Sequence, residues 1–119
     1  MILFELSNFL WLEPWHPVER VLGVPGLELE LQREVGAGHR LYHLAGDCTP
    51  VARRFDTDDV LFAVVDPDGP VLLWAEIHLT WRASRESDPQ FPWVVAYDSI
   101  HEWAEGSMKA DHADWAAPP

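Results

Sequence analysis

The sequence is poor in cysteine and in lysine. Cys48 is the only cysteine among 119 residues, which excludes an internal disulfide and a cysteine-rich zinc site. Lys109 is the only lysine, and the 8 basic residues are outnumbered by 20 acidic ones, so the formal net charge is −12. A chain this acidic repels phosphate backbones and anionic lipid surfaces. We therefore expect neither nucleic acid nor a membrane as its partner.

The sequence also lacks a recognisable targeting segment. The N-terminal stretch MILFELSNFLWL is apolar but contains Glu5, and no basic residue precedes Arg20. It is too short to span a bilayer and lacks the basic start of a signal peptide. A lone thiol is typical of a reducing compartment, so we expect a cytoplasmic protein. The length fits one domain, residues 1–119, and a hydrophobic fraction of 48% is enough to build a core.

Tryptophan is abundant, with 7 residues in the chain. Each indole is a large apolar body with one N–H donor, so some tryptophans are expected at the edge of the core or in an interface. An acidic, tryptophan-rich chain favours a basic protein as its partner, because its long-range field speeds the encounter with positive charge. The alternative is that the charge only keeps the protein soluble. The sequence leaves the oligomeric state open.

The middle of the chain has the pattern of antiparallel strands. Apolar runs at 50–55, 60–65 and 71–81 predict three strands, and the turn signal at 66–69 joins the last two as a hairpin. A shorter run at 94–97 predicts a fourth strand. Short connections between consecutive strands predict a meander.

The C-terminal segment from residue 99 has the pattern of an amphipathic helix. Ser99 and Glu102 form a capping-box pair at its start, and Gly106 weakens it by about 1 kcal/mol relative to alanine. We expect this helix to pack on one face of the sheet. The residues predicted on its inner face are Ile100, Trp103, Ala104, Ser107, Met108, Asp111 and Trp115.

The N-terminal third is ambiguous. Leucines and glutamates alternate at the strand period over LELEL, but these residue types favour helix and Gly36 stands at a helix stop, so we expect a helix over 27–35. Pro17 is expected to open a short helical turn that ends at Gly23. The predicted fold class is α+β: an antiparallel β-meander of about three to five strands, with the C-terminal helix on one face and short N-terminal helical elements.

Four stretches of the chain, read together, have a family likeness. They are GHRLYHLAGD, ARRFDTDDVLFAV, HLTW at 78–81, and DSIHEWAEGSMKADHADW, and they cover roughly residues 34–115. They resemble a group of small acidic bacterial proteins of unassigned function, in which a DDVLF strand precedes an HLTW strand and a helix with an M-x-x-D-H end. Members are similar to products of reading frames found beside secreted-toxin genes. The resemblance implies an immunity-type protein that neutralises a toxin.

One predicted strand places polar side chains in a column. Glu76, His78 and Thr80 share a face at a spacing of about 6–7 Å, and Arg53 or Arg54 from a neighbouring strand is expected to reach Glu76. A histidine beside an orienting carboxylate is the equipment of general acid–base chemistry. The alternative is an amphipathic sheet face beneath the C-terminal helix, with His78 and Thr80 held by hydrogen bonds near Asp111.

Two functional interpretations follow. The first is a non-enzymatic protein-binding protein without catalytic residues or cofactor, because neither a nucleophile-elbow motif nor an HExxH motif occurs. The second is a small enzyme or small-ligand binder that uses the polar column, lined by tryptophans. The candidate binding residues are Arg54, Trp74, Glu76, His78, Thr80, Trp81, Asp111 and His112.

The remaining polar groups have structural interpretations. Asp111 is expected to accept hydrogen bonds from a buried tryptophan N–H, from Thr80 or from an arginine. His112, near the end of the helix, is favoured there by the helix dipole when protonated. The 6 histidines show no metal-ligand motif, so we expect no metal site.

Two short features complete the pattern. Asp58 and Asp59 are adjacent carboxylates, which are typical of a solvated turn. Cys48 is expected to be structural, because the neighbouring Asp47 raises rather than lowers the pKa of a thiol.

Overall fold

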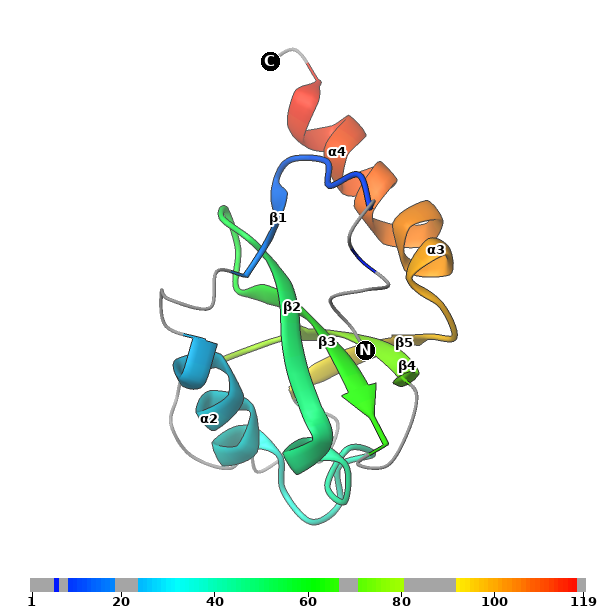
Figure 1. Ribbon diagram of the computed structural model, residues 1–119. Helices are drawn as coiled ribbons and strands as arrows, with labels where there is room; N and C mark the ends of the chain where they lie inside the picture. The colour runs from blue at the N-terminus through cyan, green and yellow to red at the C-terminus, as the bar shows by residue number, and fades with distance from the viewer. Residues whose placement is uncertain (1–5, 7–8, 19–23, 67–70, 81–91, 118–119) are drawn as a thin grey trace.

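Five strands form one antiparallel sheet in the computed structural model, which describes residues 6, 9–18, 24–66, 71–80 and 92–117. Their order across the sheet follows the chain, so that they form a meander (Figure 1). The predicted α+β fold and the meander are confirmed. The strands are β1 Trp15–Pro17, β2 Cys48–Arg54, β3 Asp59–Val65, β4 Val71–His78 and β5 Trp93–Tyr97.

The edge strand β1 corrects one expectation. Pro17 does not open a helical turn but is the last residue of β1, opposite Ala52 of β2. Proline has no N–H to donate, and an edge strand tolerates it because only one side of such a strand needs partners. The rest of the predicted turn, up to Gly23, lies outside the described residues, as do residues 67–70 of the predicted hairpin turn.

Both faces of the sheet are buried. Along β3, Val60, Phe62 and Val64 belong to one hydrophobic core, whereas Leu61 and Ala63 belong to the other. Side chains alternate in direction along a strand, which produces this division. A strand buried on both sides is apolar throughout, and the segment VLFAVV accordingly contains no polar residue.

Helix α2, Val24–Glu34, covers the first of these cores. Leu27, Leu31 and Val35 recur every four residues and are buried in it, while Leu29 is exposed. A spacing of four residues places side chains on one side of a helix, whereas a strand would bury Leu29 with its neighbours. The helix predicted over 27–35 is therefore confirmed, with a shift of its bounds.

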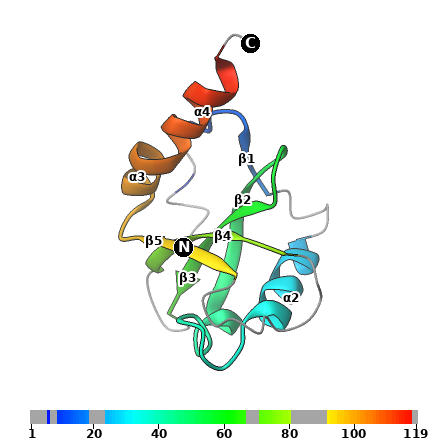
Figure 2. The same ribbon diagram turned by 180° about the vertical axis from the view of Figure 1, so that it is seen from behind.

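The C-terminal segment covers the opposite face as one helix with a π-helical turn inside it. Ser99 caps its start, since the Ser99 hydroxyl accepts a hydrogen bond from the Glu102 N–H at 3.1 Å, as the capping box predicted. Seen from behind, α2 and this helix lie on either side of the strands (Figure 2). The remaining helical elements are η1 Ala45–Asp47, α3 Ile100–Trp103, the π-helical turn η2 Ala104–Met108, and α4 Lys109–Ala116.

The inner side of this helix forms the second core with the sheet. Trp103 is completely buried, and its ring meets that of Trp15 edge to face with centroids 5.0 Å apart. Trp115, by contrast, is exposed and does not belong to this core. The predicted inner-face residues that are buried are Ile100, Trp103, Ala104 and Met108.

Gly106 lies within the π-helical turn, against Tyr97 of β5. A Cβ atom at this position would lie 3.3 Å from Cε1 of Tyr97, which is closer than ordinary van der Waals contact. Glycine therefore lets the helix approach the sheet here, and this packing offsets its intrinsic cost to the helix.

Candidate functional site

Glu76, the first residue of the predicted polar column, lies under the C-terminal helix. Its Oε1 accepts hydrogen bonds from Nε1 of Trp103, at 2.8 Å, and from the hydroxyl of Ser107. Burial raises the pKa of the Glu76 carboxyl, and these two hydrogen bonds partly oppose the shift. The expected contact between Glu76 and Arg53 or Arg54 is wrong. Glu76 instead joins the helix to the sheet.

His78 lies at the exposed end of β4 and pairs with Asp59. Nδ1 of His78 donates to Oδ1 of Asp59 at 3.0 Å, because a carboxylate can only accept. Oδ2 of the same carboxylate accepts a hydrogen bond from the Thr57 hydroxyl at 2.8 Å. Asp59 begins β3 directly opposite His78, so the expectation of a solvated turn at Asp58 and Asp59 is wrong for Asp59.

Thr80 contacts a different element again. Its backbone N–H lies 2.8 and 3.0 Å from the two carboxylate oxygens of Glu34, on α2. Strand β4 ends at His78, so Thr80 no longer follows the alternation of the strand. Neither His78 nor Thr80 is hydrogen-bonded to Asp111, and that expectation is wrong.

The residues of the column therefore do not converge on a common ligand. Glu76, His78 and Thr80 each contact a different partner from a different element. Trp74, which was expected to line such a site, is buried in the second core. Trp81 lies outside the described residues.

Asp111 joins α4 to the first two strands. Its Oδ2 accepts a hydrogen bond from Nε1 of Trp15 at 2.8 Å, and its Oδ1 lies 3.3 Å from Nη1 of Arg54. The predicted hydrogen bond from a tryptophan is thus confirmed, and the predicted arginine contact is an ion pair. Arg54 also donates two hydrogen bonds of 2.9 Å to Asp56, which lowers the pKa of the Asp56 carboxyl.

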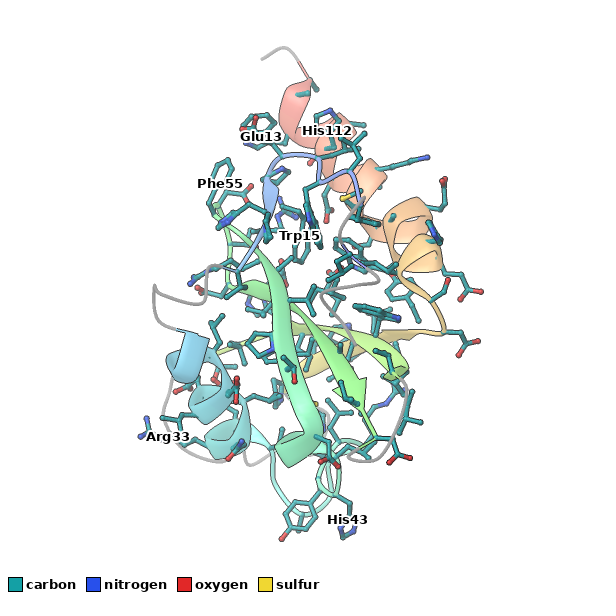
Figure 3. The ribbon with its side chains drawn as sticks, viewed as in Figure 1. Glu13, Trp15, Arg33, His43, Phe55 and His112 are labelled. Atoms are coloured by element: carbon teal, nitrogen blue, oxygen red, sulfur yellow. The ribbon has the colours of Figure 1, made fainter. Side chains whose placement is uncertain are left out.

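Four rings form a row where β1, the end of β2 and α4 meet. The ring centroids lie 6.1 Å apart between His16 and Phe55, 5.9 Å between Phe55 and Trp115, and 6.4 Å between Trp115 and His112. We call this row the aromatic ridge. Phe55 and Trp115 are 55% and 43% exposed, and the two imidazoles are half-buried. Figure 3 shows Phe55 and His112 at this end of the molecule, with Glu13 beside His112.

The two ends of the aromatic ridge differ in charge. At one end, Nδ1 of His112 donates to the backbone carbonyl of Glu13 at 2.6 Å. The carboxylates of Glu13 and of Asp114, which precedes Trp115 on α4, have no ion-pair or hydrogen-bond partner among the described residues. At the other end, Arg53 lies opposite His16 in the register. Two acidic residues thus belong to segments at the Trp115 end, and a basic residue stands at the His16 end.

Sequence reasoning missed the aromatic ridge. Trp115 has the correct spacing for the inner face of the helix, but α4 extends past the strands, so its last turn has no sheet to cover (Figure 1). Phe55 and His16 carry no signal of their own, because only the pairing of β1 with β2 brings them together. Sequence reasoning therefore lacked both the pairing of β1 with β2 and the exposed end of the helix.

His39 has a structural role. Its Nδ1 accepts a hydrogen bond from the N–H of Leu41 at 3.0 Å, so its Nε2 donates to the carbonyl of Pro92 at 2.8 Å. The ring thus ties the segment after α2 to the start of β5. Within the described parts of the chain, no three histidine, cysteine or carboxylate side chains come together in a way that holds a metal ion.

Cys48 is buried at the start of β2. Its thiol donates a hydrogen bond to the carbonyl of Leu44 at 3.4 Å. Burial, assisted by the charge of Asp47, raises the pKa of the Cys48 thiol to about 12. The thiol is therefore protonated and structural at neutral pH, as expected from the sequence.

Comparisons with protein-family models, with curated proteins and with solved structures found no match. Among the residues described, no helix is both long and apolar enough to cross a membrane. The likeness to the group with the DDVLF and HLTW strands therefore stays a prediction.

Proposed function

We propose that this protein is a non-enzymatic cytoplasmic binding protein whose aromatic ridge docks on a basic protein. The supporting observation is the pair of Phe55 and Trp115, which stay exposed although their rings pack edge to face with centroids 5.9 Å apart. Large aromatic side chains are enriched at the centres of protein interfaces, where they supply much of the binding energy. An exposed cluster of them is typical of a contact surface.

The charge of the protein defines the kind of partner. A net charge of −12 produces a negative field that attracts a basic protein and steers the encounter. Exposed charges contribute mostly to the rate of association, whereas buried aromatic contacts contribute to the lifetime of the complex. The acidic surface and the aromatic ridge thus act at different distances on the same partner.

The scaffold under the aromatic ridge keeps its rings in place before binding. Asp111 connects α4 to Trp15 and Arg54, and His112 is hydrogen-bonded to the backbone of Glu13. A contact surface that is ordered in advance loses less conformational entropy on binding. Asp111 and His112 precede Trp115 by four and three residues, which is about one turn of α4.

We infer an immunity-type role from the resemblance to small acidic bacterial proteins associated with toxin genes. The partner in this proposal is a secreted bacterial toxin with a basic surface. The resemblance supports the biological class, and the aromatic ridge supports the contact surface.

The test is co-expression with the products of neighbouring genes, followed by size-exclusion chromatography and calorimetry of any complex. A double variant, Phe55→Ser with Trp115→Ser, removes the exposed rings of the aromatic ridge. The matched control is Tyr42→Ser with His43→Ser, because these rings also pack edge to face, at 5.0 Å, at the opposite end of the molecule (Figure 3). We expect the ridge variant to bind at least about thirtyfold more weakly, as for interface hot spots, and the control to bind normally.

Two results would contradict the proposal. One is that no basic neighbour product forms a complex with the wild-type protein. The other is that the ridge variant and the control variant bind such a product equally well.

The Asp59–His78 pair supports a second candidate function, a small hydrolase. The Thr57 hydroxyl orients Asp59, Asp59 fixes Nδ1–H of His78, and the neutral ring then presents Nε2 as a proton acceptor on a side chain that is 54% exposed. In such a reaction Nε2 takes a proton from water and the hydroxide adds to the acyl carbon of an ester. The imidazolium then returns the proton to the alkoxide oxygen as the acyl C–O bond breaks, so that the alcohol leaves and the ring is neutral again. His43 is an exposed histidine without a carboxylate partner among the described residues.

Hydrolysis of p-nitrophenyl acetate separates this candidate from the first. A hydrolase predicts that His78→Gln and Asp59→Asn each lower the rate well below that of His43→Gln. Equal rates of hydrolysis in the three variants would mean that the activity is the background reactivity of surface imidazoles. That result would exclude the second candidate.

A further inference from the structure

We propose that the Trp115 end of the aromatic ridge binds guanidinium groups, so that the basic partner docks through arginine rather than lysine. This inference rests on the proposed function and names the chemistry that the docking surface recognises. Three features of the ridge support it: the angle between its rings, the unpaired carboxylates beside them, and the state of the arginine underneath.

The rings at this end form a corner. Phe55 and Trp115 meet at an interplanar angle of 86°, and the imidazole of His112 is stacked on Trp115 at 28°. Although these rings pack on one another, Phe55 and Trp115 are 55% and 43% exposed, so each leaves part of its ring surface open to a ligand. A guanidinium is planar and weakly hydrated, and it stacks on an aromatic face while its N–H groups stay directed outward. An ammonium group has no plane to stack and holds its water more strongly.

Two acidic residues belong to the segments that meet at this corner. Glu13 is next to His112 through the 2.6 Å hydrogen bond from Nδ1 to its backbone carbonyl, and Asp114 is next to Trp115 on α4. Neither side chain has an ion-pair or hydrogen-bond partner in the part of the chain that the structure describes. A guanidinium stacked on Trp115 directs its N–H groups sideways, where a carboxylate accepts two of them at once.

The chain contains an internal example of the same recognition. Arg54, which precedes Phe55, donates two hydrogen bonds of 2.9 Å to Asp56, and it lies 3.3 Å from Asp111. Arg54 therefore pairs with two carboxylates beneath the aromatic ridge and not with those at its rim. The rim charge is available to a cation that comes from outside.

The His16 end of the aromatic ridge fits a cation less well. Arg53 stands opposite His16 in the register of β1 and β2, and its positive charge repels an incoming arginine. The guanidinium site therefore lies between Phe55 and His112 and is centred on Trp115.

The test compares two peptides of equal charge, hexa-arginine and hexa-lysine, by calorimetric titration of the full chain at low ionic strength. We expect the arginine peptide to bind about two- to fivefold more tightly, since stacking on an exposed ring adds to an electrostatic attraction that both peptides share. Trp115→Leu keeps an apolar side chain but removes the π face, and it is expected to lose most of the preference for the arginine peptide. The Tyr42→Ser/His43→Ser control is expected to keep the preference, and its unfolding midpoint and that of Trp115→Leu serve as folding checks.

Glu13→Gln with Asp114→Asn tests the carboxylates separately. We expect this double variant to weaken binding of the arginine peptide more than binding of the lysine peptide, because only a guanidinium makes the paired hydrogen bonds.

Equal affinity of the two peptides for the wild-type protein overturns the guanidinium site, and so does an arginine preference that Trp115→Leu leaves undiminished. These outcomes are distinct from failure of the proposed function. If the peptides bind equally but the Phe55→Ser/Trp115→Ser variant still loses its protein partner, the aromatic ridge docks a protein by other contacts. If that variant keeps its protein partner, both proposals fall.

Discussion

Two carboxylates attach the C-terminal helix to the rest of the molecule by accepting hydrogen bonds from indole N–H groups. Glu76 accepts from Trp103, and Asp111 accepts from Trp15. Both tryptophans are buried, at 0% and 1% exposure. Removal of either acceptor leaves a buried donor without a partner, which costs about 1–3 kcal/mol.

Asp111→Ala is therefore expected to lower the free energy of unfolding by about 1–3 kcal/mol, since both Trp15 and Arg54 lose their contact with α4. Asp111→Asn keeps an acceptor for Trp15 and is expected to lose less. Denaturation in urea measures both values. Asp114→Ala, one turn along the same helix and exposed, is the control and is expected to change stability by no more than about 0.5 kcal/mol. Equal losses in Asp111→Ala and Asp114→Ala would show that the bridge does not stabilise the helix.

Glu76→Gln tests the second carboxylate through its pH dependence. Burial raises the pKa of Glu76 above 4.5 in the folded protein, so the folded state holds this proton more tightly than the unfolded state does. Ionisation of Glu76 therefore lowers stability as pH rises from about 4.5 through the folded pKa. Glutamine keeps an acceptor for Trp103 and has no charge to desolvate.

We expect the wild-type protein and Glu76→Gln to have similar stability at about pH 4, and the variant to be relatively more stable at about pH 8. Urea denaturation at each pH measures the unfolding free energy of both proteins. Taking the difference between them removes the contribution of titrating groups that both proteins share. This prediction would be contradicted if the wild-type protein became more stable relative to Glu76→Gln as pH rises. The hydrogen bonds to the ionised Glu76 carboxylate would then outweigh the cost of its desolvation.

Sequence reasoning succeeded for individual residues where local spacing decides the outcome. The helical period alone placed Asp111 on the inner face, and its bonds from a tryptophan and an arginine followed. Sequence reasoning failed where the strand register determines which side chains meet. That Asp59 stands opposite His78 depends on how β3 pairs with β4, and a shift of one residue would give His78 another partner.

Among the elements, the π-helical turn η2 is the one that no sequence pattern indicated. It spans Ala104–Met108, where Gly106 packs against Tyr97 and Ser107 reaches Glu76. A π-helical turn is rare and is often found at functional or strained positions. Its position here is explained by packing against the sheet, which a local pattern does not contain.

Gly106→Ala tests this packing. In an open helix the change gains about 1 kcal/mol, but here the new Cβ would lie 3.3 Å from the Tyr97 ring and must displace it. In the wild-type protein we expect Gly106→Ala to stabilise the fold by less than this, or to destabilise it. In a Tyr97→Val background we expect the full increase in stability. A double-mutant cycle of unfolding free energies measures this coupling. Equal effects of Gly106→Ala in both backgrounds would contradict the proposed contact.

The other elements were predictable to different degrees. Strands β2 to β5 were predicted because apolar runs and turn signals alternate along the chain. Strand β1 was not, because three residues ending in Pro17 carry no strand period. The LELEL segment fits both periods, and only the burial of Leu27, Leu31 and Val35 on one side of α2 decides between them.

For the whole molecule, the acidic charge and the aromatic ridge together support the proposed binding function. Composition gave the charge directly, and an excess of tryptophan indicated that some rings lie at an interface. Which tryptophan does so required the complete fold. Trp15 and Trp103 are buried, whereas α4 carries Trp115 past the strands to Phe55 (Figure 1).

The tryptophans also allow a direct test of the aromatic ridge, because each of the 7 indole N–H groups gives its own signal in a two-dimensional nitrogen–proton spectrum. The measurement is a titration of the labelled full chain with the hexa-arginine peptide, with the Trp115 signal assigned from Trp115→Leu. We expect the Trp115 signal to shift as the peptide binds, and the signals of the buried Trp15 and Trp103 to stay in place. Binding that leaves the Trp115 signal unchanged would contradict a contact at the aromatic ridge.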